Sequence, residues 1–229
     1  MTQGYDPQSF GVRRESVASY TAKTFGWMFL GLLTTFAVAL TMYYTGAVSI
    51  LYQGLVPFAL LLAEFGVVIY LSARLHKLRI GLARGLFFAY AVLNGVTFSS
   101  IFAVYSVTSL VFVFGMTALY FGVMALYGFV TKSDLSRIRP VLMFGLVALM
   151  AMLLLSMFIP GMDTGLCLVG VVLFVAFTAY DTQMIRHNYA ALQGNAEMLQ
   201  KASILSALQL YLDFINLFLY LLRLFGRRD

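Results

Sequence analysis

Seven long hydrophobic blocks, separated by short polar connectors, dominate the sequence. A helix needs about 20 apolar residues to cross the hydrocarbon core of a membrane, and each block is near or above that length. The blocks cover residues 24–44, 51–73, 85–105, 109–131, 140–159, 164–185 and 203–225. The pattern therefore predicts an all-α membrane protein whose domain, residues 24–229, is a seven-transmembrane-helix bundle.

The composition agrees with a membrane protein and excludes several other classes. Hydrophobic residues make up 62% of the chain and charged residues only 10%, well below the roughly 25% of an ordinary soluble domain. The net charge is +6, but the basic residues lie in connectors, so we expect no nucleic-acid binding. The single cysteine, Cys167, lies inside a hydrophobic block and implies neither a disulfide nor a redox role.

Basic residues alternate between the connectors in a way that predicts orientation. The N-terminal tail, residues 1–23, carries Arg13, Arg14 and Lys23, while the first, third and fifth connectors have no lysine or arginine. The second, fourth and sixth connectors contain Arg74, Lys77, Arg79, Arg84, Lys132, Arg137, Arg139, Arg186 and Lys201. Because short cytoplasmic loops are enriched in lysine and arginine, we expect a cytoplasmic tail and an uncleaved first helix.

The C-terminal arginines do not follow this alternation. Arg223, Arg227 and Arg228 come after the seventh block. They lie outside the cell if that block crosses the membrane, and inside if it re-enters and returns. We expect it to cross, because earlier helices usually dominate orientation.

Three carboxylic acids fall inside predicted spans: Glu64, Asp181 and Asp213. An acid at the centre of a membrane helix costs about 2.5–3.5 kcal/mol and usually faces the bundle interior or a water-filled cavity. At about 1.5 Å per residue, Glu64 lies about 15 Å inward from Arg74, and Asp181 about 7–8 Å inward from Arg186. All three acids are thus expected in the cytoplasmic half or near the midplane.

The seventh block also carries a polar stripe. Its members are Ser206, Gln209, Asp213, Asn216, Tyr220 and Arg223, at spacings of 3, 4, 3, 4 and 3. That spacing places them on one helical face, which would be penalised against lipid. The block is therefore expected inside the bundle or along an aqueous path, with Ser206, Gln209 and Asn216 as pore-lining candidates.

A purely structural role for these polar groups remains open. Asp213 can hydrogen-bond across helices, and Asp181 can reach the interface and pair with Arg186. For Asn94, Thr97 and Ser100 in the third block, helix packing is the favoured role.

Enzymatic and cofactor chemistry finds little support in the sequence. His76 and His187 fall in connectors without ligand spacing, and no span contains a lysine that could hold retinal. Nucleophile-elbow, Walker and dinucleotide motifs are also absent from the sequence. We therefore expect neither an enzyme nor a bound cofactor.

Two stretches around the aspartates resemble a known family. They are Thr178-Ala-Tyr-Asp181-Thr-Gln183 and Leu210-Tyr-Leu-Asp213-Phe-Ile-Asn216-Leu-Phe218. With Ser99-Ser100-Ile101-Phe102 and Leu126-Tyr127-Gly128, they resemble the Bax inhibitor-1 (transmembrane BAX inhibitor motif) family. The resemblance extends over essentially the whole chain and looks most like the bacterial inner-membrane members.

This resemblance implies seven helices with the C-terminal helix central, and a pH-sensitive calcium leak. The leak is built around an aspartate pair, which corresponds to Asp181 and Asp213 and would bind calcium transiently. An acid in the second helix corresponds to Glu64, and an arginine that latches one aspartate to Arg74. Some bacterial relatives are instead described as modulators of a membrane protease, so a non-transporting role with such a partner is the alternative.

The aspartate pair suggests a proton-dependent mechanism. Two carboxylates about 4 Å apart repel by about 4 kcal/mol at an effective dielectric near 20, which favours one shared proton. Protonation would weaken a bond to Arg74, whereas the deprotonated oxygens suit calcium. A third interpretation, an intramembrane aspartyl protease, also needs two aspartates, but Leu210-Tyr211-Leu212 replaces its Gly-x-Gly signature before Asp213.

Overall fold

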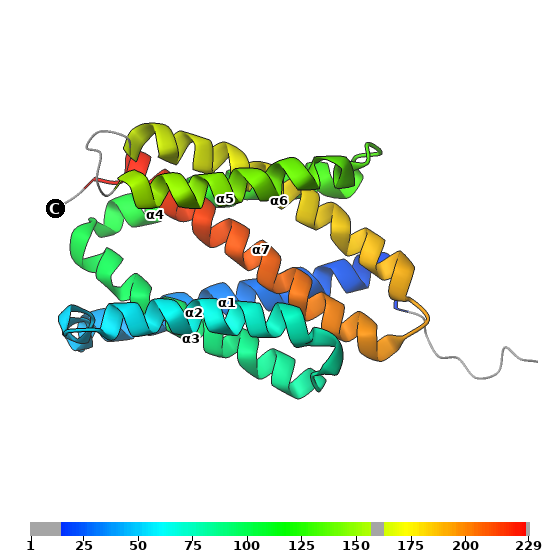
Figure 1. Cartoon of the computed structure of the whole chain (residues 1–229), viewed down its shortest axis with the longest axis horizontal. Coiled ribbons are helices and arrows are strands. Elements are labelled where there is room, and N and C mark those ends of the chain that lie inside the picture. The colour runs from blue at the N-terminus through cyan, green and yellow to red at the C-terminus, as the bar shows by residue number, and fades with distance from the viewer. Residues whose placement is uncertain (1–14, 157–162, 228–229) are drawn as a thin grey trace, which may run out of the picture.

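The computed structural model describes residues 15–156 and 163–227. Within these residues, seven long helices follow one another (Figure 1). They are α1 (Val17–Tyr44), α2 (Val56–Arg74), α3 (Ile80–Val104), α4 (Val107–Val130), α5 (Arg139–Ser156), α6 (Asp163–Leu192) and α7 (Ala196–Phe225). Short 3₁₀ helices η2 (Ala47–Tyr52), η3 (Leu75–Lys77) and η4 (Leu135–Ile138) lie in the connectors.

All seven helices are long and apolar enough to cross a membrane, with η3 continuing α2 and η4 preceding α5 in their spans. The predicted all-α, seven-span fold is therefore confirmed. Arg13, Arg14, Arg228 and residues 157–159 of the predicted fifth block lie outside the described residues.

Several helix ends differ from the hydrophobic blocks. The first helix begins at Val17 instead of residue 24, because the Ser16 side chain caps it by accepting a hydrogen bond from the Ser19 N–H at 3.1 Å. Lys23 therefore belongs to α1 and not to a tail. The second helix begins at Val56 instead of residue 51, since η2 and a left-handed Gly54 (φ +47°) precede it.

The sixth connector is much shorter than predicted. Residues 186–202 were expected between spans, but α6 continues to Leu192 and α7 starts at Ala196, where Asn195 caps it by accepting from the Met198 N–H at 3.0 Å. Both helices thus continue as polar extensions beyond their apolar blocks. Lys201 lies within α7, where it is buried and pairs with Glu197 at 2.7 Å.

The C-terminal helix is the most buried of the seven. In its apolar window 72% of residues are buried, against 6% for α2 and 11% for α5. It packs against α1, α3, α4 and α6, and Figure 1 shows it running diagonally between the α1–α2–α3 group and the α4–α5–α6 group. This packing is compatible with the expected central position of α7.

Aromatic side chains of α7 pack against the neighbouring helices. Three such pairs, with ring centroids 5.4–6.1 Å apart, are Tyr211 with Phe87 of α3, Phe214 with Phe121 of α4 and Phe218 with Phe98 of α3. The Tyr211 hydroxyl is also hydrogen-bonded to Thr35 Oγ1 of α1 at 2.7 Å. These contacts hold α7 at a fixed rotation, and so fix the direction of its polar face.

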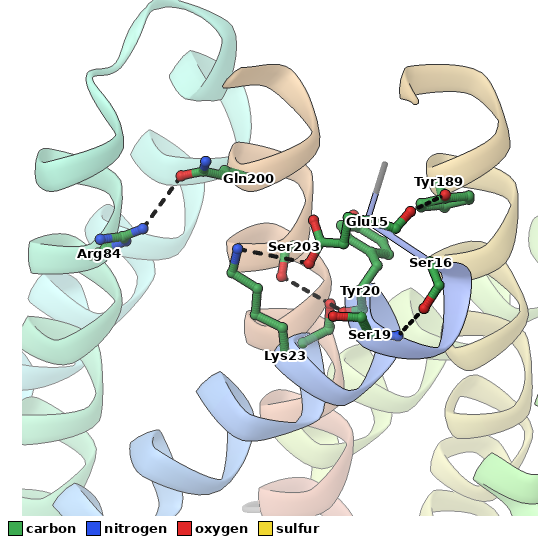
Figure 2. A network of polar contacts seen from close by, with 10 residues as sticks. Glu15, Ser16, Ser19, Tyr20, Lys23, Arg84, Tyr189, Gln200 and Ser203 are labelled. Carbon is green, nitrogen blue, oxygen red and sulfur yellow. Dashed lines mark hydrogen bonds and ion pairs between the residues drawn. The ribbon is translucent and has the colours of Figure 1, made fainter. Parts of the chain in front are cut away.

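Polar contacts join the helices at one end of the bundle (Figure 2). Thr24 Oγ1 of α1 and Ser203 Oγ of α7 are 2.9 Å apart. Tyr189 of α6 donates to the Glu15 carbonyl oxygen just before α1, and Arg84 of α3 donates to Gln200 of α7 at 3.4 Å. Four helices are therefore tied together at the end where α1 begins.

Candidate functional site

A partly open cavity of about 520 Å³ brings the three membrane acids together. Its wall includes Glu64 from α2, Asp181 from α6 and Asp213 from α7, and side chains of α3 and α5 complete it. These acids are far apart in sequence, so their shared cavity is a product of the fold. The structure thus joins the three predicted site acids in one place.

Asp181 and Asp213 form a pair between α6 and α7. They are only 6% and 3% exposed, and their carboxyl groups are close enough to interact with each other. Two buried carboxyl groups that face each other repel when both are charged, and they attract when one of them donates a proton to the other. Such a pair is therefore expected to share one proton. Asp213 Oδ2 is buried and has no hydrogen-bond partner among the described residues.

Glu64 lies on the α2 side of the cavity. It is half-buried, and one of its oxygens accepts a hydrogen bond from Thr97 Oγ1 of α3 at 2.7 Å. Thr97 and Asn94 also line the cavity, whereas the Ser100 hydroxyl donates to the Thr97 carbonyl within α3. Thr97 therefore positions an acid in addition to packing helices. The sequence of α3 alone does not show that Thr97 faces α2.

The polar stripe of α7 faces the cavity along much of its length. Gln209, Asp213, Asn216 and Tyr220 all line the wall. Ser206, predicted to line a pore, does not line this cavity; it is buried and accepts a hydrogen bond from Asn188 Nδ2 at 3.3 Å. One turn of the stripe thus binds the polar extension of α6 instead.

The arginine that acts on the aspartate pair differs from the one suggested by resemblance. Arg74 is exposed at the end of α2, and its side chain makes no ion pair or hydrogen bond with any described residue, so its latch role stays a prediction. Arg139, at the start of α5, is the arginine whose charge acts on Asp181. In the sequence, the only indication that Arg139 could act on the pair was its position directly before Pro140, at the cytoplasmic end predicted for the fifth span.

The acids do not form a conventional metal centre. Within residues 15–156 and 163–227, no group of three or more histidine, cysteine, aspartate or glutamate side chains could hold a metal ion. Calcium takes about six to eight oxygen ligands, so a calcium ion at the pair would keep much of its water. Such a site suits passage or brief binding more than permanent retention.

Comparison with known proteins identifies the relatives of this chain. Residues 17–229 match the family model described as inhibitor of apoptosis-promoting Bax1. The chain belongs to the Bax inhibitor-1 family. The match includes all seven helices and all three cavity acids.

Bacterial proteins of similar length are close relatives of this Bax inhibitor-1 family member. The inner membrane protein YbhL of Escherichia coli K12 is 40% identical over 220 residues, covering 94% of each chain. An uncharacterized protein of Borreliella burgdorferi is 40% identical over 91% of this chain and 92% of its own. Another from Deinococcus radiodurans is 38% identical over 94% and 93%.

Proposed function

We propose that this protein is a pH-sensitive cation leak of the bacterial inner membrane, with calcium as the conducted ion and no catalytic activity. The observation that supports it is the buried pair of Asp181 and Asp213, which lines a cavity together with Glu64. The location follows that of its relative YbhL, which is an inner membrane protein.

The aspartate pair is the pH-sensitive element in this proposal. With one shared proton, the carboxyl groups attract each other and hold α6 against α7. Without it, two carboxylates about 4 Å apart repel by about 4 kcal/mol at an effective dielectric near 20, and a divalent cation offsets that repulsion. The charge in the cavity and the contact between the two helices therefore change together with pH.

Other oxygens in the cavity supply further steps for a cation. Glu64 of α2 lines the same cavity as the pair, and the side-chain amides of Gln209 and Asn216 lie on the same α7 face as Asp213. Carboxylate and amide oxygens are ligands that calcium prefers. A cation would exchange part of its hydration shell for these groups in turn.

A calcium-flux assay in liposomes tests the proposal. Purified wild-type protein and Asp213→Asn are compared across the physiological pH range with a calcium-sensitive dye inside the vesicles. We expect the wild-type flux to vary with pH, and Asp213→Asn to lower the flux and flatten its pH profile, because asparagine cannot exchange the shared proton.

Asp134→Asn is the matched control for loss of one acid. Hydrogen bonds from the Ser136 hydroxyl and N–H hold the pKa of Asp134 below its usual value, so it is a charged, exposed carboxylate outside the cavity. Its substitution should leave flux and pH profile unchanged. If Asp213→Asn behaves like this control, the aspartate pair does not gate a leak.

A further inference from the structure

The lining of the acid cavity combines negative charge with aromatic surface. Among the described residues that line it, three are acids and none is a lysine, arginine or histidine. Its aromatic members are Phe65, Tyr90, Phe98, Phe174, Phe177 and Tyr220. Carboxylates attract a cation by charge and aromatic faces by cation–π interaction, so this lining is complementary to a cation with apolar groups.

The rim of the cavity lies between two helices that face lipid. Leu61 and Phe65 of α2 are 49% and 46% exposed, and Met150 of α5 is 43% exposed, although all three line the cavity. The packing contacts of α2 are with α3 and the short helices η2 and η3, and those of α5 are with α6 and η4. In Figure 1, α7 is visible between α2 and α5.

This rim indicates a lateral entrance from the membrane. Both α2 and α5 are strongly apolar spans that are largely unburied within the protein, so the exposed rim residues contact acyl chains. A molecule dissolved in the bilayer can therefore reach the cavity without first passing through water.

One oxygen atom in the cavity wall lacks a hydrogen-bond partner among the described residues. Asp213 is 97% buried, lines the cavity, and its Oδ2 has no hydrogen-bond partner among the described residues. An unpaired buried carboxylate oxygen costs free energy that a bound cation would recover. A neutral acyl chain in the same place would leave that oxygen uncompensated.

We propose that the cavity is a binding site for lipophilic organic cations, such as phosphonium or quaternary ammonium ions with aromatic arms. These enter from the bilayer between α2 and α5. The positive centre lies beside Asp213 and Glu64, and the arms contact the aromatic wall. The cavity volume, about 520 Å³, is within the range of about 300–1,000 Å³ that is typical of small-molecule sites.

Tetraphenylphosphonium and tetraphenylborate form a matched pair of probes for this site, because they have the same shape and opposite charge. Their binding to the full chain in phosphatidylcholine nanodiscs is measured by equilibrium dialysis without calcium, with protein-free nanodiscs as background. We expect saturable binding of tetraphenylphosphonium and only background partitioning of tetraphenylborate. Equal uptake of both probes above their protein-free backgrounds would overturn the proposal.

Substitutions locate the site. Asp213→Asn and Glu64→Gln, in which glutamine can still accept the Thr97 hydrogen bond, should each weaken tetraphenylphosphonium binding by about tenfold, equivalent to about 1.4 kcal/mol. Asp134→Asn should have no effect. Unchanged binding in Glu64→Gln, whose side chain is only half-buried, would exclude this cavity even if Asp213→Asn fails to fold.

The entrance is tested separately by Leu61→Trp, which narrows the rim without changing an acid. Association of tetraphenylphosphonium should slow, and an unchanged association rate would contradict lateral entry. Because no calcium is present, binding of the organic cation can be detected even if the protein conducts no calcium. Calcium flux can likewise be detected even if the organic cation does not bind.

Discussion

At the residue scale, Gly128 shows how closely two helices approach beside the aspartate pair. A Cβ added to Gly128 of α4 would overlap the Ala179 carbonyl oxygen of α6 and lie 2.8 Å from its carbonyl carbon. Ala179 is two residues before Asp181, so this contact helps to set the position of the acid. Backbone atoms cannot move aside as a flexible side chain can.

Gly128→Ala should therefore destabilise the protein by about 1–3 kcal/mol, the usual cost of overpacking a well-packed site. The measurement is heat-induced unfolding in detergent, followed by size-exclusion chromatography. Gly122→Ala on the same helix is the control, since nothing lies within 4 Å of its added Cβ and alanine favours helix. Equal melting of the two variants would show that the α4–α6 contact is less tight than described.

The acids of the site could be predicted from the sequence, but their partners could not. Glu64, Asp181 and Asp213 stand out because hydrocarbon penalises charge, which is a property of each position alone. The Thr97 contact to Glu64 and the effect of Arg139 on Asp181 depend on how separate helices pack. Spacing along the chain carries no such information. Arg74 was the candidate latch through the family resemblance, and that role stays a prediction.

At the element scale, hydrophobicity predicted the spans well and the helix ends poorly. Hydropathy identifies the segment that lies in lipid, whereas helices end where caps and turns occur. Ser16 and Asn195 cap helices that extend beyond their apolar blocks. The polar extensions of α6 and α7 could not be predicted from the length of the apolar blocks, because polar and charged residues interrupt these extensions.

Gln183 of α6 joins its helix to the connector between α4 and α5, which contains η4. Its Nε2 donates to the Ser133 carbonyl oxygen at 2.7 Å, and its Oε1 accepts from the Leu135 N–H at 2.8 Å. The side chain is buried, and it lies two residues after Asp181. This double contact fixes the start of α5, which contains Arg139, relative to the aspartate pair.

Gln183→Leu should lower stability by about 1–3 kcal/mol, because the buried Leu135 N–H loses its partner, whereas the carbonyl of the exposed Ser133 can bond to water. Thermal unfolding in detergent measures the loss. Gln193→Leu is the control, since Gln193 is exposed and its amide donates only to Ala190 within α6. A melting temperature unchanged from wild type in Gln183→Leu would mean that water replaces the side chain at no cost.

At the scale of the whole molecule, the bundle separates its basic connectors from its C-terminal end. Figure 1 places the start of α1, the α2–α3, α4–α5 and α6–α7 connectors at one end, and the end of α7 at the other. Because α7 is one continuous helix, the seventh block has the form of a full crossing. Arg227 then lies at the opposite end of the bundle from the other basic connectors, which does not follow the enrichment of lysine and arginine on the cytoplasmic side. The sequence predicted this crossing from the orientation of the earlier helices.

Cysteine accessibility tests this orientation directly. In a Cys167→Ala background, single cysteines replace Ser136 in the α4–α5 connector or Arg227 after α7, both of which are exposed. Because lysine and arginine favour the cytoplasmic side, an impermeant maleimide should label position 227 in intact bacterial cells and position 136 only after permeabilisation.

Labelling of both positions before permeabilisation would contradict the prediction that they lie on opposite sides of the membrane. Labelling of position 136 alone would mean that the whole bundle is inverted. In the inverted case, the proposed leak would present its aspartate pair to the external pH instead of the cytoplasmic pH, since Asp181 lies near the basic end of the bundle.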